Sequence, residues 1–153
     1  MRPEETMKAF ETPESVVAEM YRLISFEPNT SPDWEKMKAL FAEEAVIFLR
    51  VSGDTQAAVS RDGLVDLFTA SIEKHKLVNS GFTEKLVSCK MEMFGAIAHC
   101  FVVYESSIPN DTRPPTRGVD SIQFVKKNGR WLVASLTNDV SGPGNPIPPK
   151  FLE

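Results

Sequence analysis

Six side chains able to hydrogen-bond or stack lie among apolar residues and are candidates for ligand contact. They are Tyr21, Trp34, Tyr104, Ser121, Gln123 and Asn138. A tyrosine hydroxyl can donate to a ligand oxygen, and buried polar groups need partners, which a bound molecule can supply. The alternatives are structural: Tyr21 with its hydroxyl in water, Trp34 in the core, and the polar strand residues bonded to each other or to the backbone.

Other titratable residues are weaker candidates for chemistry. His99 could carry a proton, but the expected strand register points it outward beside Lys90. Asp120 and Asp139 lie near strand ends, where we expect them to be solvated. The catalytic residues, if the protein has any, therefore stay unassigned from the sequence.

The chain lacks the motifs that hold common cofactors and metals. It has no CxxC pair, metal-ligand cluster, glycine-rich phosphate loop or GxSxG motif, so we expect no cofactor and no metal. Cys89 and Cys100 are interpreted as buried thiols, with a cross-strand disulfide as the alternative. The formal charge of −4 disfavours nucleic acid as a partner. The polar N-terminus has no apolar signal core and no run reaches membrane-spanning length, so we expect no membrane partner and a cytoplasmic location.

Three helices can be predicted from their start signals. Thr12-Pro13-Glu14 and Ser31-Pro32-Asp33 each combine a capping residue with a proline and an acid, and a third helix begins after Ser60 and ends near Lys76. Apolar residues recur at helical spacing after each start. Each helix therefore has one face to bury.

Six strands are predicted, mostly late in the chain. They cover residues 45–50, 55–59, 82–93, 96–107, 116–126 and 130–138. Early helices and late antiparallel strands predict an α+β fold, with three helices packed on a strongly curved, mostly antiparallel six-stranded sheet. We expect an N-terminal arm at 1–12, one domain at 13–140 and a proline-rich tail at 141–153.

Two hairpins set the predicted faces of this sheet. Asn128-Gly129 suits a type I′ turn, which places Val125 opposite Leu132 and Ser121 opposite Leu136. In this interpretation Ser121, Gln123 and Asn138 face the helices. A turn near Phe94-Gly95 would place Cys89 opposite Cys100 and give that hairpin one strongly apolar face.

The same register leaves apolar side chains on the outer face. They are Phe101, Ile122, Phe124, Trp131 and Val133. Such a patch exceeds what monomers usually expose, so we expect a homodimer through the outer sheet face. The alternative is that the N-terminal segment or the proline-rich tail covers it.

Three segments resemble a known superfamily. They are Asp33–Phe48, Gly95–His99 and Ser121–Val133. Across residues 13–140 the chain resembles nuclear transport factor two-like domains, the cone-shaped α+β fold that SnoaL-type polyketide cyclases, ketosteroid isomerase and scytalone dehydratase share. The resemblance implies an apolar pocket between helices and sheet, and often a dimer through the outer face.

The resemblance also implies roles for particular residues. Alignment with ketosteroid isomerases places Tyr21 near their catalytic tyrosine, Ser121 at their oxyanion-stabilising acid and Asn138 at a pocket aromatic. Their general base falls on Leu49, which cannot accept a proton. The missing base and acid argue against that isomerase chemistry.

Three functions stay open at this point. The favoured one is a pocket protein that binds a small apolar or carbonyl-containing molecule. The second is a cofactor-independent cyclase, dehydratase or isomerase that uses pocket tyrosine, serine or histidine. The third is a non-catalytic dimerisation or interaction domain.

Overall fold

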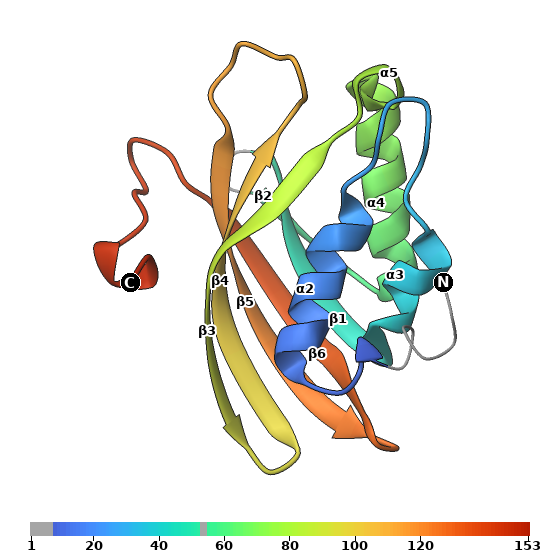
Figure 1. Cartoon of the computed structure of the whole chain (residues 1–153), viewed down its shortest axis with the longest axis vertical. Coiled ribbons are helices and arrows are strands. Elements are labelled where there is room, and N and C mark those ends of the chain that lie inside the picture. The colour runs from blue at the N-terminus through green and yellow to red at the C-terminus, as the bar shows by residue number, and fades with distance from the viewer. Residues whose placement is uncertain (1–7, 53–54) are drawn as a thin grey trace.

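Six strands form one curved sheet in the computed structural model, which describes residues 8–52 and 55–153 (Figure 1). The strands are β1 (Phe41–Ser52), β2 (Thr55–Val59), β3 (Thr83–Phe94), β4 (Ile97–Ser107), β5 (Thr116–Lys127) and β6 (Arg130–Val140). Their order is β2-β1-β6-β5-β4-β3. Strands β1 and β6 pair in parallel and all other neighbours are antiparallel. The α+β class and the mostly antiparallel six-stranded sheet are confirmed.

The helices are α2 (Pro13–Ile24), α3 (Trp34–Ala39), α4 (Arg61–Lys74) and the short α5 (Leu77–Ser80), which was not predicted. Helices α2 and α4 begin where the sequence predicts, whereas α3 begins later than expected because Asp33, and not Ser31, is its N-cap. The side chains of Thr12, Asp33 and Ser60 each accept a hydrogen bond from a backbone N–H of the first turn, at 3.0–3.2 Å. Within the described residues, none of the helices is both long and apolar enough to span a membrane.

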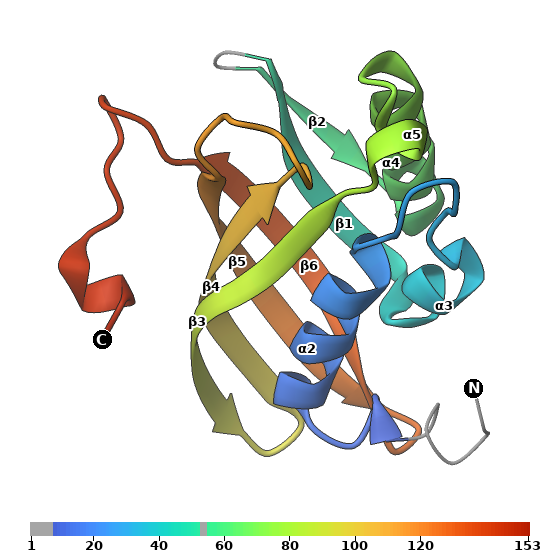
Figure 2. The same ribbon diagram turned by 45° about the horizontal axis from the view of Figure 1, so that its top comes forward.

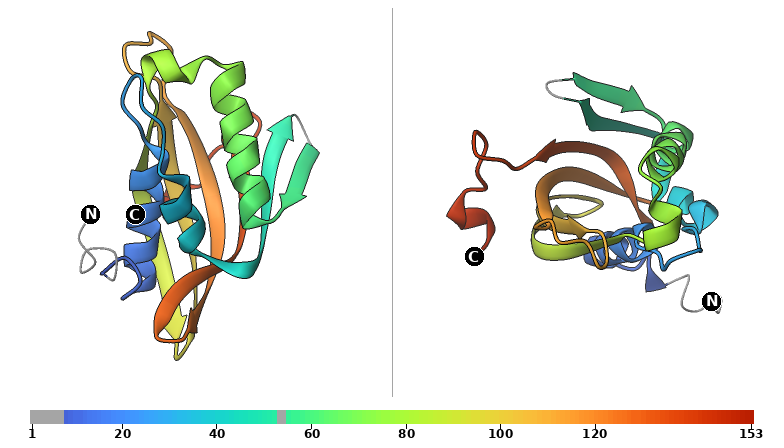
Figure 3. Two further views of the ribbon diagram at one scale, coloured as in Figure 1. Left: turned by 90° about the vertical axis from the view of Figure 1, so that its right-hand side faces the viewer. Right: turned by 90° about the horizontal axis from the view of Figure 1, so that it is seen from above.

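The sheet curls around the apolar face of α2, as the view from above shows (Figure 3, right). Helix α2 lies along the concave side of β3 to β6, and α4 packs beside β1 and β2 (Figure 2). Val16 and Val17 of α2, Val102 of β4 and Ile122 of β5 are almost inaccessible to solvent. The core therefore lies between the helices and the concave face.

The β5–β6 hairpin has the predicted turn but not the predicted faces. Asn128 and Gly129 have φ of 53° and 77°, and Val125 pairs with Leu132 as expected. A β-bulge then leaves Ala134 unpaired, because Phe124 pairs with Val133 and Gln123 with Ser135. Beyond the bulge Ser121 opposes Thr137, not Leu136.

The assignment of the inner and outer faces on this hairpin was wrong. Ile122, Phe124, Trp131 and Val133 were expected outside but are buried in the core under the helices. Ser121 and Gln123 consequently lie on the outer face, and Gln123 is exposed. The physical reason is the hydrophobic effect. The large rings and branched side chains are removed from water, and the polar residues that alternate with them stay in contact with water. Phe101 alone among the predicted outer residues is exposed there.

The β3–β4 hairpin keeps its predicted faces from the turn to Ser88 although its register differs, and a β-bulge at Val87 changes the faces beyond that point. Phe94 pairs with Ile97, so the turn is Gly95-Ala96, and Cys100 opposes Met91 rather than Cys89. A shift of two residues preserves the side on which each side chain lies. Cys100 is therefore buried on the inner face, and both cysteines are free thiols.

The C-terminal tail covers part of the outer sheet face. A 3₁₀ turn, η1 (Pro149–Phe151), lies against β3 and β4. The Phe151 ring stacks on Phe101 with centroids 5.1 Å apart, and Ser88 Oγ donates a hydrogen bond to the Phe151 carbonyl. The tail therefore covers part of the outer apolar surface, as the alternative interpretation expected.

Candidate functional site

A cavity of about 220 Å³ lies between α2, α4 and the concave face of the sheet. Most of its lining is apolar, including Met20, Ile24, Phe41, Leu64, Phe68 and Leu136. Polar side chains from five elements also reach it: Tyr21 from α2, Glu84 from β3, Tyr104 from β4, Asp120 from β5 and Asn138 from β6. This combination of apolar walls with a few polar groups is typical of small-molecule sites.

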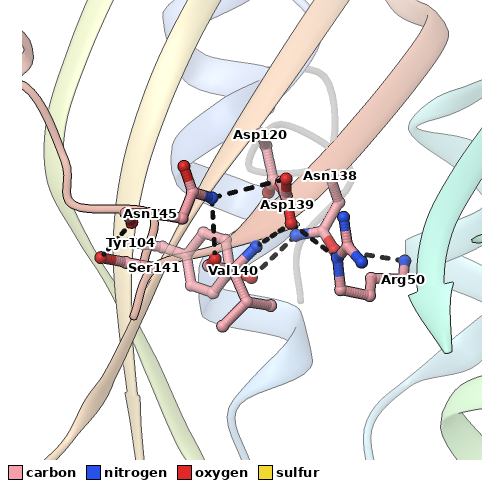
Figure 4. A network of polar contacts seen from close by, with 8 residues as sticks. All are labelled: Arg50, Tyr104, Asp120, Asn138, Asp139, Val140, Ser141 and Asn145. Atoms are coloured by element: carbon pink, nitrogen blue, oxygen red, sulfur yellow. Dashed lines mark hydrogen bonds and ion pairs between the residues drawn. The ribbon is translucent and has the colours of Figure 1, made fainter. Parts of the chain in front are cut away.

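Asp120 is the centre of the polar group. The Tyr21 hydroxyl donates to its Oδ2 and Asn138 Nδ2 donates to its Oδ1 at 3.1 Å. Asn138 Nδ2 also donates to Tyr104 Oη at 2.8 Å, as Figure 4 shows. Asp120 is only 6% exposed, so these bonds replace those that water would make.

Burial shifts the ionisation of these groups. Removal from water raises the pKa of Asp120 to about 6, and the hydrogen bonds from Tyr21 and Asn138 limit the rise. Burial, and then the nearby Asp120 carboxylate, raise the pKa of Tyr21 and of Tyr104. Both tyrosines therefore stay protonated at neutral pH, while Asp120 titrates close to it.

Glu84 brings a second carboxyl group to the same cavity. Its backbone N–H donates to Ser25 Oγ at 2.9 Å and its carbonyl accepts from the same hydroxyl at 3.1 Å, which ties the start of β3 to the end of α2. Its side chain is partly buried and accepts no hydrogen bond from the described residues. Burial, with a smaller contribution from the Asp120 charge, raises the pKa of Glu84 to about 8.

A polar network continues from the cavity towards the C-terminal tail (Figure 4). The backbone N–H of Arg50 donates to Asn138 Oδ1 at 3.4 Å, and Arg50 Nε donates to Asp139 Oδ1 at 2.6 Å. Asn145 Nδ2 donates to the Val140 carbonyl at 3.2 Å. The orientation of Asn138 is thus fixed from both the cavity side and the β1 side.

The ring of Tyr104 needs the absence of a side chain at Gly118. The two residues pair across β4 and β5, and a Cβ at Gly118 would lie 2.2 Å from Tyr104 Oη. On its other side Tyr104 stacks with Tyr21, with centroids 5.9 Å apart and an interplanar angle of 29°. Gly118 therefore positions one wall of the site.

The structure brings together three of the six predicted ligand residues. Tyr21, Tyr104 and Asn138 line the cavity. Trp34 does not line the cavity, but it stacks on the lining residue Phe68 with ring centroids 6.2 Å apart. Ser121 and Gln123, on the outer face, do not reach the cavity.

Sequence reasoning missed the two acids. Asp120 has the same strand parity as Ile122 and Phe124, so recognising those two as core residues would have pointed to it. Its expected solvation was wrong, because it is buried. Glu84 lies next to Lys85 at the start of a predicted strand, and no pattern in the sequence distinguishes it from a surface acid.

The other candidates do not form a comparable site. A wider groove of about 740 Å³ runs past the end of α2 and the following loop, but four of its charged side chains pair with each other, Arg22 with Glu19 and Lys36 with Asp33. His99 is exposed on the outer face and lies 3.5 Å from Glu92. In the part of the chain that the structure describes, no three metal-ligating side chains are grouped.

Solved structures with this fold are similar over most of the chain. An NTF2-like protein of unknown function from Pseudomonas putida KT2440 matches 89% of this chain and 79% of its own, with 12% identity and a TM-score of 0.59. An NTF2-like protein with a cystatin-like fold from Novosphingobium aromaticivorans matches 79% and 77%, with 14% identity and a TM-score of 0.60. The yeast UBP3-associated protein BRE5 matches 84% and 93%, with 13% identity and a TM-score of 0.60.

At these identities the similarity concerns architecture and not activity. No protein-family model and no curated protein matches the sequence. The arrangement of helices on a curved six-stranded sheet, together with these structures, shows that the chain has the nuclear transport factor two-like, or cystatin-like, fold.

Proposed function

We propose that this protein binds a small, largely apolar molecule in the cavity. The polar end of that molecule would lie at Asp120 and the polar side chains around it. The observation that carries the proposal is the convergence of Tyr21, Glu84, Tyr104, Asp120 and Asn138 at an apolar cavity of about 220 Å³. A cavity of this size suits a compact molecule, because the apolar walls favour a hydrocarbon body and the polar groups fix its orientation.

Acid–base catalysis on a carbonyl compound is the second candidate function. Two carboxyl groups that titrate near neutral pH are suited to proton transfer, and Asp120 and Glu84 have pKa values of about 6 and 8. Asp120 is adjacent to Ser121, where the resemblance implied an acid, and it contacts Tyr21. Leu49 lines the cavity at the position of the missing base, so proton transfer would depend on Glu84 and Asp120.

The test of ligand binding uses one cavity-filling variant and one matched control. Leu49 of β1 lines the cavity, while Val46 of the same strand is 45% exposed on the opposite face. Native mass spectrometry of protein purified from cells is expected to show a retained small molecule in the wild type and in Val46→Phe, and none in Leu49→Phe. Equal retention in both variants would place the bound molecule elsewhere and contradict the proposal.

A further inference from the structure

We propose that the ligand of this cavity is an organic cation, a small amine whose ammonium group binds at the carboxyl groups of Glu84 and Asp120. The inference rests on the proposed function, which it narrows from any small apolar molecule to one class. Three features of the cavity support it: its hydrogen-bond balance, its charge and its aromatic walls.

Around the two acids of the cavity, hydrogen-bond acceptors outnumber the available donors. Both hydrogens on Asn138 Nδ2 are used, one for Tyr104 and one for Asp120, and the Tyr21 hydroxyl hydrogen is used for Asp120. The acceptors include both Glu84 carboxyl oxygens, which receive no bond from the described residues, and further lone pairs on Asp120. A ligand that fits must supply donors, and an ammonium group supplies three.

In the part of the chain that the structure describes, no basic side chain forms an ion pair with Glu84 or Asp120. The Asp120 carboxylate of β5 adds to the rise in the pKa of Glu84, and Glu84 in turn raises the pKa of Tyr104 of β4 and of Tyr21 of α2, so none of these interacting groups is basic. Arg50 is the basic residue that lines the cavity, and it forms an ion pair with Asp139. A buried carboxylate without a cation is costly, so a positive ligand would remove a penalty that the folded protein otherwise carries.

The walls near the acids also favour a cation. Tyr21 and Tyr104 are stacked beside Asp120, and Phe68 lines the same cavity. Aromatic faces attract ammonium groups, and the attraction is stronger where water is excluded. Met20 and Ile24 then offer an apolar surface to the hydrocarbon part of the amine.

A neutral carbonyl ligand is the competing occupant. It could accept a hydrogen bond from the Tyr104 hydroxyl, or from Glu84 while that carboxyl is protonated. It would leave the Asp120 lone pairs and the negative charge unchanged. The two classes therefore differ in what they do to the protonation of Glu84.

The experiment compares three probes with one ring and different head groups: benzylamine, benzyl alcohol and benzoate. Binding is measured at pH 7.5 by NMR titration of wild type, Glu84→Gln and the control Glu92→Gln, which alters an 83% exposed glutamate of the same strand. We expect benzylamine to bind the wild type at least about tenfold more tightly than benzyl alcohol, and benzoate more weakly than both. Glu84→Gln should remove most of that preference, and Glu92→Gln should retain it.

Calorimetry adds a readout that a merely structural role would not change. Benzylamine binding should release protons at pH 7.5, because a neighbouring cation lowers the pKa of Glu84 from its value of about 8. Binding enthalpies in two buffers with different ionisation enthalpies report this release, which should disappear in Glu84→Gln.

The outcomes separate the inference from the function on which it rests. If benzyl alcohol binds as tightly as benzylamine and Leu49→Phe blocks both, the cavity binds ligands but the amine assignment is wrong. The same holds if the preference for benzylamine survives in Glu84→Gln. If none of the probes binds and no small molecule is retained in native mass spectrometry, the proposed function fails as well.

Discussion

Two acids in the cavity, the buried Asp120 and the partly buried Glu84, have shifted ionisation. The pKa values of Asp120 and Glu84 rise from 3.8 and 4.5 to about 6 and about 8. The folded state therefore holds more protons than the unfolded chain between about pH 4 and pH 8. Stability from these groups is present at low pH and is lost as the pH rises through this window, the reverse of the usual behaviour of ion-paired acids.

Glu84→Gln should flatten this pH dependence. The amide cannot ionise, so the variant avoids the cost of a buried carboxylate at high pH. We expect the loss of unfolding free energy between pH 5 and pH 8.5 to shrink by on the order of 2 kcal/mol relative to the wild type. Urea unfolding at the two pH values measures it, and an unchanged difference would show that Glu84 titrates as in the unfolded chain.

Tyr21→Phe should shift the pKa of Asp120 upwards. The Tyr21 hydroxyl stabilises the Asp120 carboxylate, so its removal should raise that pKa above its value of about 6. The buried acceptor also loses a partner, which should lower the unfolding free energy at pH 8 by about 1–3 kcal/mol.

Carbon-13 NMR of the carboxyl groups follows the Asp120 titration in this variant. Tyr104→Phe is the control, because its hydroxyl bonds Asn138 and not Asp120. A shift of the same size in both variants would mean that general packing, and not the Tyr21 bond, sets the pKa.

At the scale of elements, local signals predict better than the choice of a face. The caps at Thr12 and Ser60 and the Asn128-Gly129 turn depend on a few neighbouring residues, and the structure confirms all three. Alternation on β5 and β6 groups side chains by face, but it does not say which face meets the helices. That choice depends on packing between distant segments, and it was wrong for Ser121 and Gln123.

The bulge at Ala134 explains why the site could be predicted only in part. It puts Asn138 on the same face as Asp120, although counting from the turn would separate them. Asn138 was therefore placed inward correctly and Asp120 was missed. A bulge inside a regular apolar strand has no turn residue or proline to mark it.

Gly118→Ala tests how β5 positions Tyr104. A methyl group there would overlap the Tyr104 ring, so the ring must move and its hydrogen bond with Asn138 should break. We expect a loss of about 1–3 kcal/mol in unfolding free energy, as for overpacked cores. Chemical denaturation measures the loss, and nuclear Overhauser contacts between Tyr104 and Tyr21 report the ring position.

Gly142→Ala is the matched control, because a Cβ at Gly142 meets no atom within 4 Å. It should leave both the stability and the Tyr104 contacts as in the wild type. If Gly118→Ala behaved like this control, the ring of Tyr104 would have room to move and Gly118 would not shape the site.

At the scale of the whole molecule, the outer sheet face keeps an apolar surface that the tail covers in part. Phe94, Ile97 and Phe101 are 83%, 60% and 48% exposed, and strand pairing puts all three on this side. The proposed homodimer would use these residues, not the buried Ile122 or Trp131 of the sequence-based expectation. The tail already occupies part of the surface, so it should compete with a second copy of the chain.

Removing the Phe151 ring should therefore favour dimerisation. In Phe151→Ala the stacked contact with Phe101 is lost and the apolar outer surface becomes larger. We expect sedimentation velocity to show a concentration-dependent dimer at about tenfold lower concentration than in the wild type. Leu152→Ala is the control. Leu152 is 42% exposed, and its replacement leaves the ring of Phe151 on Phe101 in place. If Phe151→Ala stays monomeric at every concentration at which the wild type does, the tail does not compete with a second copy and the outer face is not a dimer interface.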